Sequence, residues 1–528
     1  MISQPDRHRA RSRAWLLDLT WGGVTYHLAE SDETYKDESG EATPYRAGLV
    51  VSGEIARAAS AGETLIEAPS ANVEMQLDGL VDVPARISAG FPLGSATATL
   101  WLWLADTSHR VKVIVGRLDA VEHGEADEPV TASIIDDADE NDQLFPPPLA
   151  RMELETVNAG VPYPWVIGSP GLATSYGAGQ VATINGSAGM VWLRGGYTFL
   201  AEILVAGHPV TASTATIVNG ETDYAQSLSI TKKTDTHGRV FSIIDVNTWA
   251  SKDRAVGASY FVAWSGGSGL EIAGDTVSGA GDVLRWALRR TDIETDPGNV
   301  AALLPMLNKY QLDCVIQAGP DSRVDLWEWL EANVLPLLPI SAIRTAGGIV
   351  FVPWRWSASP SDAVAHLVEG ANCERLGSVG YAPRDEVRNE FRLSYAPDIR
   401  AGGFGKTAVL TGSDTTLEED STAVRSGLCA DSDRAYGTRV WQGSTSVVYD
   451  DATAQRIVRD LAARYTSQPR HIGYTVTPDA AAHIDAADVV SVTDKAIGLD
   501  GALFFVTDKP SSSGEFFGVA LREIIGRV

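Results

Sequence analysis

Apolar and polar residues alternate in short runs over much of the chain, a pattern that predicts a mainly β protein. Between Arg13 and Leu149 these runs are bounded by Gly, Pro and Asp, as is typical of strands. We expect strands at 14–21, 23–30, 71–80, 97–106, 109–123 and 130–136. An acidic run at 136–142 and a proline-rich connector follow, so the pattern predicts a first β-domain over residues 1–150.

The run at 97–106 is apolar on both sides. Trp101 and Trp103 fall on one face, and Leu100, Leu102 and Leu104 fall on the other. One face is expected to enter the core. The second face is expected to pack on a neighbouring domain or to form a subunit interface, and the run could be an exposed sheet edge.

A second group of alternating runs predicts an inserted all-β module over residues 151–275. Strands are expected at 197–207, 214–220, 227–246 and 259–267. The segment 234–238, with sequence TDTHG, divides the third run and is typical of a hairpin turn.

Apolar residues three and four positions apart predict a small helical domain over residues 276–383. Helices are expected at 282–291, 299–313 and 323–339. Asn299 can cap the second, and Asp321 or Ser322 can cap the third. A tight hairpin is expected at 344–356, where two glycines supply the turn.

The final region, residues 384–528, opens with an alternating strand at 386–395. The polar stretch 396–433 is expected to be a long loop or interface arm. An amphipathic helix is predicted at 452–467, with Ile457 and Leu461 on its apolar side and Arg464 on its polar side. Four strands are expected after it, at 471–476, 488–493, 503–507 and 515–523.

Composition agrees with a multidomain protein that is mainly β with a helical segment. The chain has 528 residues, which exceeds the usual size of one core, and its 50 glycines and 25 prolines favour many turns. Three cysteines, Cys314, Cys373 and Cys429, are widely spaced and odd in number, so we expect buried thiols and no disulfide framework.

The formal net charge of −26 argues against a protein that grips nucleic acid phosphates or anionic membranes. No run of 18 apolar residues occurs, so we expect no membrane insertion by this chain. The basic N-terminus lacks the apolar core of a secretion signal.

Candidate sites for chemistry are weak. Asp137, Asp139 and Asn141 imitate a calcium loop, but Asp142 replaces the required glycine and Pro148 the bidentate Glu, so a solvated acidic loop is favoured over a metal site at 136–142. The GKT of Gly405–Thr407 resembles a phosphate-binding loop, yet Arg400 stands where its first glycine belongs.

No metalloprotease, hydrolase or zinc motif occurs either, and we predict no catalytic, cofactor-binding or metal residues and no enzyme. One group of tryptophans could form a sugar platform, but its helical and strand spacing favours a core. Its members are Trp286, Trp327, Trp329, Trp354 and Trp356.

The order of several short patterns carries a resemblance to a known family. The strand RNEFRLSY holds Asn389 and Tyr395, and SDRAYGTR holds Tyr436 and Gly437. Further along come Arg464 and Tyr465, then DVVSVTD at 488–494, and finally Glu523. In this order the chain resembles the hub proteins at the distal end of phage tails, which include baseplate hubs of contractile phages and tail-tip hubs of siphophages.

The resemblance implies a homotrimer in the virion tail tip, made in the host cytoplasm. Two tube-like β-barrel ring domains per subunit, at 1–150 and 384–528, would form a pseudo-sixfold ring that adapts the sixfold tail tube to a threefold tip. Implied partners are the distal tail protein, the C-terminus of the tape measure protein, and tail fibres or spike proteins on separate chains. Genomic DNA would pass on ejection without specific binding.

Two rival functions remain at this point. A carbohydrate-binding tail adhesin or host-recognition protein is suggested by the inserted module and the tryptophans, and a cell-wall hydrolase of the tail is a third hypothesis. The hub function is preferred because no catalytic constellation is visible. The lumen-lining residues, the host and receptor, the closed or open state of the tip and the role of the inserted module are not determined by sequence.

Overall fold

The computed structural model describes most of the chain in segments. These are residues 13–36, 42–52, 71–77, 80–104, 109–123, 128–136, 144–145, 165–167, 180–183, 191–196, 199–206, 208–210, 214–219, 224–234, 240–245, 259–265, 270–272, 275–289, 295, 297–316, 324–345, 348–354, 358–398, 403–412, 421–477, 480–481, 484, 488–508 and 517–524. All statements below concern these residues.

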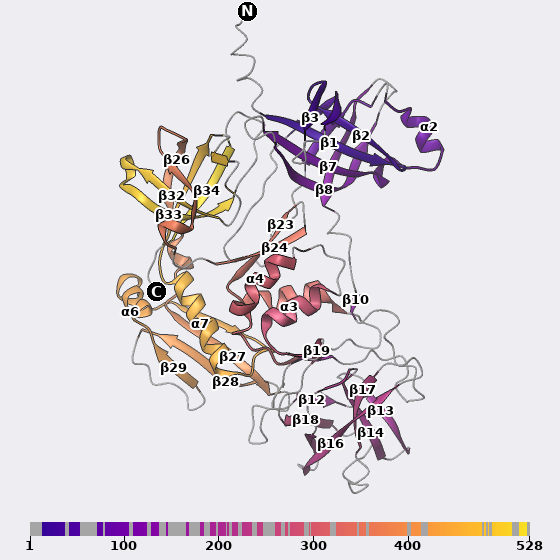
Figure 1. The fold of residues 1–528 in the computed structure, drawn as a ribbon. Coiled ribbons are helices and arrows are strands. Elements are labelled where there is room, and N and C mark those ends of the chain that lie inside the picture. The colour runs from indigo at the N-terminus through magenta and orange to yellow at the C-terminus, as the bar shows by residue number, and fades with distance from the viewer. Residues whose placement is uncertain are drawn as a thin grey trace, which may run out of the picture.

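A nine-stranded sheet forms the first region, with strand order β3-β4-β2-β1-β7-β8-β9-β6-β5 (Figure 1). All six predicted strands are present, whereas the short β3, β4 and β5 and the helix α2 (Val83–Ser88) were not predicted. The strands are β1 (Arg13–Trp21), β2 (Val24–Ala29), β3 (Glu33–Lys36), β4 (Ala42–Ala47), β5 (Leu49–Ser52), β6 (Ala71–Met75), β7 (Thr97–Leu104), β8 (His109–Glu122) and β9 (Val130–Asp136).

This sheet curls back on itself at Gly48. β4 pairs with β2 and β5 pairs with β6, so one continuous segment, 42–52, contacts strands far apart in the sheet order. Gly48 has φ +142°, and a Cβ added to it would lie 3.0 Å from the backbone oxygen of Gln76. No sheet in the described residues closes into a barrel, so the predicted barrels are corrected to curled, open sheets.

The strand with the two tryptophans is central, which corrects the expectation of an exposed edge. β7 lies between β1 and β8. Leu100 and Leu102 face the main core, while Trp101 and Trp103 pack against a second small core that includes Tyr35 and Tyr45. The two tyrosines come from β3 and β4, so the tryptophan face is covered by its own sheet and not by a neighbouring domain.

The inserted module is a seven-stranded sheet with order β12-β18-β15-β16-β17-β14-β13. Its predicted strands are confirmed, and β16 and β17 pair antiparallel around the predicted turn, of which residues 235–238 lie outside the described residues. The strands are β12 (Gln180–Thr183), β13 (Val191–Gly196), β14 (Phe199–Ala206), β15 (Thr214–Asn219), β16 (Tyr224–Thr234), β17 (Val240–Asp245) and β18 (Ser259–Ser265).

Short two-stranded pairs join the sheets to the helices. β10 (Leu144–Phe145) pairs with β22 (Val324–Asp325), β11 (Trp165–Ile167) pairs with β21 (Cys314–Ile316), and β19 (Leu270–Ile272) pairs with β20 (Asp275–Val277). Segments on both sides of the inserted module therefore contact the helical region.

The helices α3 (Ala280–Leu288) and α4 (Pro297–Leu307) lie between the first sheet and the inserted module (Figure 1), and α5 (Leu326–Asn333) shares one hydrophobic cluster with them. All three were predicted, as was the hairpin of β23 (Ile340–Thr345) and β24 (Gly348–Pro353). The proposed cap at Asn299 is wrong, because Asn299 lies inside α4 and its amide exchanges hydrogen bonds with the backbone of Phe351 at 2.8 and 2.9 Å. Asp321 and Ser322 lie outside the described residues.

A four-stranded sheet, in the order β29-β28-β27-β30, packs against the predicted long helix α7 (Asp451–Tyr465). Its members are β27 (Glu390–Asp398), β28 (Gly403–Thr411), β29 (Ser421–Arg425) and β30 (Val440–Ser444). With α6 (Gly427–Tyr436), β28 and β29 occupy the stretch that was predicted to be a loop, so that prediction is wrong. The buried residues of β28, such as Ala408, Val409 and Leu410, are consecutive in the chain, so the strand lacks the alternating pattern of a half-buried strand.

The last sheet has six strands, in the order β25-β32-β33-β34-β31-β26. The four predicted strands are β31 (Arg470–Val476), β32 (Val489–Asp494), β33 (Leu499–Asp508) and β34 (Phe517–Glu523). The two edge strands, β25 (Ala363–Val368) and β26 (Cys373–Tyr381), come from earlier in the chain, and β25 pairs with β32 in parallel.

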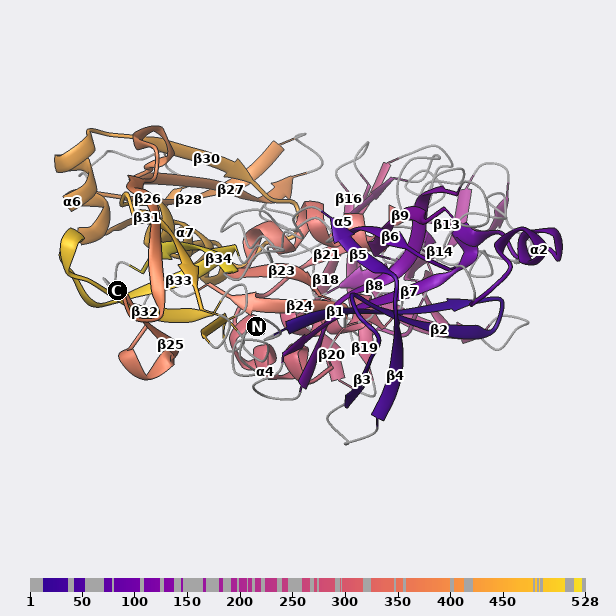
Figure 2. The ribbon, with the colours of Figure 1, turned by 90° about the horizontal axis from the view of Figure 1, so that it is seen from above.

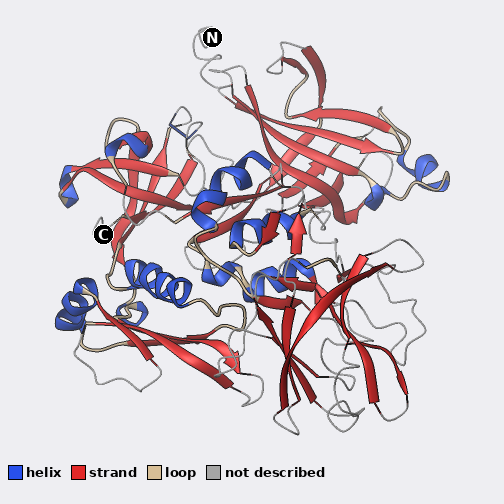
Figure 3. Cartoon of the chain, turned by 60° about the horizontal axis from the view of Figure 1, so that its bottom comes forward, coloured by secondary structure: helices blue, strands red, loops and turns tan. Residues whose placement is uncertain are grey.

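Two hydrophobic clusters organise the molecule. One joins α3–α5 and the β23–β24 hairpin to α7 and the four-stranded sheet. The other contains buried residues of both the nine-stranded and the six-stranded sheet. Both sheets lie above α3 and α4 in Figure 1, and in Figure 2 the six-stranded sheet lies on the left and the nine-stranded sheet on the right. Strands dominate the cartoon in Figure 3, which confirms the mainly β, multidomain class with a helical segment. In the described residues, no helix is long and apolar enough to cross a membrane.

Candidate functional site

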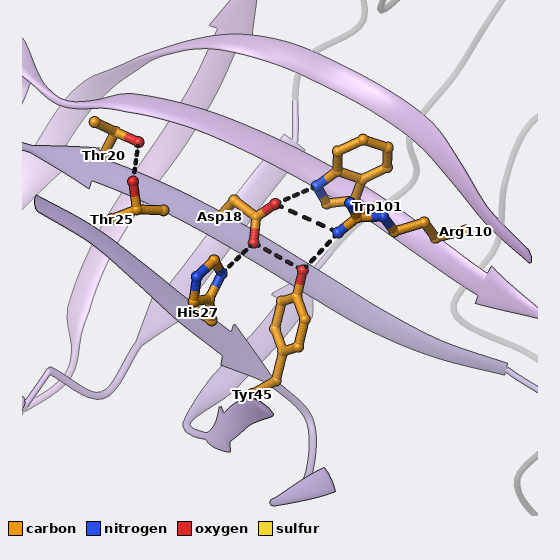
Figure 4. Close-up of polar contacts among 7 residues, drawn as sticks. All are labelled: Asp18, Thr20, Thr25, His27, Tyr45, Trp101 and Arg110. Atoms are coloured by element: carbon orange, nitrogen blue, oxygen red, sulfur yellow. Dashed lines mark hydrogen bonds and ion pairs between the residues drawn. The ribbon is translucent and has the colours of Figure 1, made fainter. Parts of the chain in front are cut away.

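The densest polar cluster lies on the outer face of the nine-stranded sheet, around Asp18 of β1 (Figure 4). His27 is its register partner on β2, and its Nδ1 lies 2.7 Å from Asp18 Oδ1. The Tyr45 hydroxyl donates to the same oxygen at 2.8 Å, and Trp101 Nε1 donates to Oδ2 at 2.8 Å. Arg110 lies 3.8 Å from Oδ2 and donates to the Tyr45 hydroxyl at 3.1 Å.

These contacts use most of the acceptor capacity of the carboxylate. A carboxylate accepts about four hydrogen bonds, and Asp18 has three hydrogen-bond contacts, with His27, Tyr45 and Trp101, and a longer ion pair with Arg110. The guanidinium of Arg110 also lies 4.3 Å from the centre of the Trp101 ring, so it covers the aromatic surface that a sugar would need. The nearby hydroxyls of Thr20 and Thr25 bond each other at 3.0 Å. The cluster therefore works as a cross-link between strands.

Burial and the Asp18 charge raise the pKa of Tyr45, so its hydroxyl stays protonated and remains a donor at any physiological pH. Sequence reasoning missed this cluster. The one available signal was Asp18 itself, the sole charged residue in the run AWLLDLTW.

The tryptophans of the helical region that the structure describes do not form a platform. Trp286 and Trp327 are buried in the central cluster and Trp329 packs against it, which confirms the core interpretation. Trp354 Nε1 donates to Ser341 Oγ at 2.9 Å. Trp356 lies outside the described residues.

The nucleotide candidate gives no phosphate-binding loop, and the metal candidate lies outside the described residues. The GKT segment lies within strand β28, where Lys406 Nζ contacts Asp451 Oδ1 at 2.7 Å, so its backbone is not the loop that holds phosphate. Asp137, Asp139, Asn141 and Asp142 lie outside the described residues, as does Pro148. Elsewhere in the described part of the chain, no group of three His, Cys, Asp or Glu side chains is placed to hold a metal.

All three cysteines are free and buried, which confirms the predicted absence of a disulfide among them. Burial raises the pKa of Cys373 to about 12, and it also raises the pKa values of Cys314 and Cys429. Because the thiolate is the reactive form, none of the three is suited to nucleophilic chemistry at neutral pH.

The residues behind the sequence resemblance lie at structural junctions. Asn389 is buried, and its side chain donates to Gly437 O at 2.9 Å and accepts from Arg439 N at 2.7 Å, which fixes the end of α6 beside β27. Gly437 closes α6 with φ +74°, a conformation that suits glycine.

Two further residues of this set hold the six-stranded sheet together. The carboxylate of Asp494 is buried, and Arg375 and Tyr474 each donate to its Oδ2 at 3.1 Å. Glu523 on β34 forms a two-point ion pair with Arg470 on β31, with one bond of 2.8 Å from Arg470 Nε. Asn389, Asp494 and Glu523 therefore each form side-chain hydrogen bonds between elements.

In the comparisons with known proteins, only solved structures are similar to this chain. No protein-family model matches the chain, and no curated protein matches it. The 43 kDa tail protein of prophage MuSo2 from Shewanella oneidensis is similar at 12% identity and a TM-score of 0.38, over 96% of this chain and 98% of that one.

A tail protein from Neisseria meningitidis MC58 is similar at 12% identity and a TM-score of 0.36, over 96% of both chains. A chain from the virion of a native gene transfer agent particle has 15% identity and a TM-score of 0.20, over 55% of this chain and 89% of that one. By their names, these three are two tail proteins and a chain of a gene transfer agent virion, and each has a TM-score below 0.5 to this chain.

Proposed function

We propose that this chain is a structural hub of the tail tip of a long-tailed bacteriophage or a related particle, and that it acts as a homotrimer in the virion. The observation that carries the proposal is the hydrophobic cluster shared by the two terminal sheets. It contains Leu17 and Leu100 of the nine-stranded sheet together with Leu367, Tyr474 and Val506 of the six-stranded sheet. One chain thus supplies two β-sheet units from its two ends, held side by side.

Three copies would place six such units around one axis. That number suits a ring that continues a sixfold tail tube and adapts it to a threefold tip. In this arrangement the hub contacts the distal tail protein on one side and holds the end of the tape measure protein before ejection. The net charge of −26 supports DNA transit, because an acidic conduit repels phosphate and does not retain it.

An exposed sheet edge supports a role in assembly. β26 is an edge strand of the six-stranded sheet, and its apolar side chains Leu376 and Tyr381 are 51% and 64% exposed. Apolar side chains on an unpaired edge invite pairing with another chain. The Asp18 cluster, whose side chains bond one another, and the buried tryptophans provide no matching support for the carbohydrate-binding alternative.

Mass measurement by light scattering tests the proposal, with the chain alone and mixed with its distal tail protein. We expect a particle of three times the 56.2 kDa chain mass. Replacing Leu376 and Tyr381 together by Asp should reduce it to monomers while the circular dichroism spectrum is unchanged. Val240→Asp, at a 37% exposed position of the inserted module, is the control and should still trimerise. A strict monomer under both conditions that binds glycans would instead identify an adhesin.

A further inference from the structure

The segment around α2 crosses one end of the nine-stranded sheet without being built into its core. Leu77 and Leu93, which are 2% and 4% exposed, anchor the chain on either side of it. Residues 80–92 lie between these anchors in the described part of the chain, and none of them is buried. By contrast, seven of the nine residues of α3 are buried. Hydrophobic burial therefore holds this segment less firmly than it holds the other helices.

One side chain attaches the segment to the sheet. Arg86 Nη2 donates hydrogen bonds to the backbone oxygens of Trp21 at 2.7 Å and Gly22 at 2.9 Å, where β1 ends and the turn to β2 begins. Its Cζ also lies 5.6 Å from the ring centre of Trp21 and 5.7 Å from that of Phe91. Hydrogen bonds from a charged donor are strong, and contact with an aromatic face adds to them. Arg86 is thus the principal polar link between α2 and the hairpin of β1 and β2.

A second bond runs in the opposite direction, from the sheet to the segment. Trp21 Nε1 donates to the backbone oxygen of Phe91 at 3.2 Å. Trp21 is fully buried, and it is one of the largest side chains of the core. Both attachments therefore converge on Trp21. If the segment moved away, this indole would lose its hydrogen-bond acceptor and part of its cover.

The segment carries its own hydrogen bonds. Asp82 caps α2, with its Oδ1 accepting from Ala85 N at 2.9 Å, and its backbone oxygen accepts from Arg86 N at 3.0 Å. Phe91 N donates to Arg86 O at 3.3 Å. Residues 82–91 can therefore move together and keep these bonds. In Figures 1 and 2, α2 lies at the end of the nine-stranded sheet that is remote from the six-stranded sheet.

We propose that residues 82–91 form a strap that opens as one unit while Leu77 and Leu93 stay in the core, and that Arg86 is the latch that keeps it closed over Trp21. A unit with little buried surface opens at a lower free energy than the sheet on which it rests. Opening exposes Trp21 and the backbone oxygens that Arg86 occupies in the closed state. The strap gives the fold a switchable surface at this end of the sheet, and it does not depend on the oligomeric state proposed above.

Native-state hydrogen exchange of the full chain, followed by mass spectrometry in low concentrations of urea, tests the strap. The amides of Arg86, Ala89 and Gly90, which bond within the segment, should exchange together and before those of β1 and β7. In Arg86→Gln the strap amides should exchange about tenfold faster or more, because bonds from a charged donor are lost, while β1 and β7 are unchanged. Arg117→Gln removes the same charge from an exposed position on β8 and should leave the strap unchanged.

Two neighbouring glycines of the turn provide a test from the opposite side of the latch. A Cβ on Gly22 would lie 2.9 Å from Arg86 Nη2 and 3.1 Å from Phe91 Cγ, whereas a Cβ on Gly23 would meet nothing within 4 Å. Both glycines have positive φ, +55° and +78°, so alanine strains the backbone at either position. Only Gly22→Ala also pushes against the strap, and Gly23→Ala is its matched control.

Hydroxyl-radical footprinting with mass spectrometry measures the exposure of Trp21 in these two variants. Oxidation of Trp21 should be faster in Gly22→Ala than in Gly23→Ala. Trp286 is equally buried but lies in the other hydrophobic cluster, so its oxidation should be the same in both.

The proposal is wrong if the strap amides of the wild-type chain exchange only with those of β1 and β7, because the segment is then part of the cooperative core. It is also wrong if Arg86→Gln accelerates exchange in the strap and in both strands equally. Equal oxidation of Trp21 in Gly22→Ala and Gly23→Ala would contradict the latch.

Discussion

Tyr395 donates a hydrogen bond of 2.9 Å from its hydroxyl to Oδ1 of Asp451, which joins the buried strand β27 to the first turn of α7. Lys406 of β28 reaches the same oxygen at 2.7 Å. One carboxylate at the start of the helix thus fixes two neighbouring strands beneath it. An acidic group is also favourable at this end of a helix because of the helix dipole.

Removing the hydroxyl in Tyr395→Phe should lower the free energy of unfolding by about 0.5–1.5 kcal/mol, the usual net value of one hydrogen bond. Urea denaturation at pH 7 measures the change. Tyr395 is fully buried, and Phe preserves the ring packing, so the loss reports the bond and not a cavity. A change of several kcal/mol would show that the hydroxyl has a larger role.

The same carboxylate predicts a pH dependence. Burial raises the pKa of Asp451, but the hydrogen bonds from Lys406 and Tyr395 outweigh it, so its pKa lies below the ordinary aspartate value. Because the folded pKa is depressed, its stabilisation is complete above the unfolded pKa and is lost as pH falls through the folded pKa. Asp451→Asn should therefore be less stable at pH 7 and show a shallower loss of stability in acid.

The ion pair between Arg470 and Glu523 should be worth more than a surface pair. The two side chains are 24% and 18% exposed, and they join β31 to β34 at two points. Glu523→Gln should cost about 1.5–3 kcal/mol in urea denaturation at pH 7, as expected for hydrogen bonds to charged groups. Arg434→Gln, which breaks an exposed pair within α6, is the matched control and should change stability by less than about 1 kcal/mol.

The ion pair of Glu523 with Arg470 also predicts how the stability of the fold depends on pH. Hydrogen bonds from Arg470 lower the pKa of Glu523 below its ordinary value. The stability that it contributes is present above the unfolded pKa and is lost as pH falls through the lower folded value. The difference between wild type and Glu523→Gln should shrink in acid, and a difference that is constant with pH would contradict this assignment.

Asp18→Asn should destabilise the nine-stranded sheet by about 2–3 kcal/mol, because the amide presents donors to groups that already donate to Asp18. Thr20→Val is the control on the same strand, where an exposed hydroxyl pair is lost and the expected change is within about 0.5 kcal/mol. Chemical denaturation monitored by tryptophan fluorescence measures both. Equal effects of the two substitutions would mean that the Asp18 cross-link contributes little.

Much of the secondary structure was predictable because its signals are local. The strands β1, β7 and β8 and the helix α7 follow directly from apolar spacing. In contrast, β25 joins the last sheet through parallel pairing with β32, and contacts between strands more than a hundred residues apart leave no local pattern. The strand β28 was missed because Gly403, Gly405 and Lys406 suggest a loop until α7 is seen to cover its buried end.

The polar junctions were hidden for a different reason. Arg464 falls on the polar side of its helix by spacing, and only the position of Trp354 on another element reveals that it is buried. The cluster around Asp18 likewise requires five strands, β1, β2, β4, β7 and β8, to lie next to one another. Sequence patterns identify which residues are polar, but tertiary packing decides which of them become buried and paired.

Two glycines near α6 separate the effect of space from the effect of backbone conformation. At Gly412 a Cβ would lie 2.4 Å from the backbone of Ala430, so Gly412→Ala must push β28 away from α6. At Gly437 a Cβ would meet nothing within 4 Å, but φ is +74°. Gly437→Ala should therefore cost about 1–3 kcal/mol, because φ +74° with ψ 166° is a region that essentially only glycine adopts.

Gly412→Ala should be the more damaging of the two, with a loss of about 3 kcal/mol or more, because a Cβ 2.4 Å from backbone atoms forces a shift of a whole element. Chemical denaturation of both variants gives the comparison, and hydrogen exchange of the α6 amides locates the change. Protection should fall across α6 in Gly412→Ala, whereas Gly437→Ala should affect only the last turn of the helix. The reverse order of stability would mean that α6 moves freely against β28.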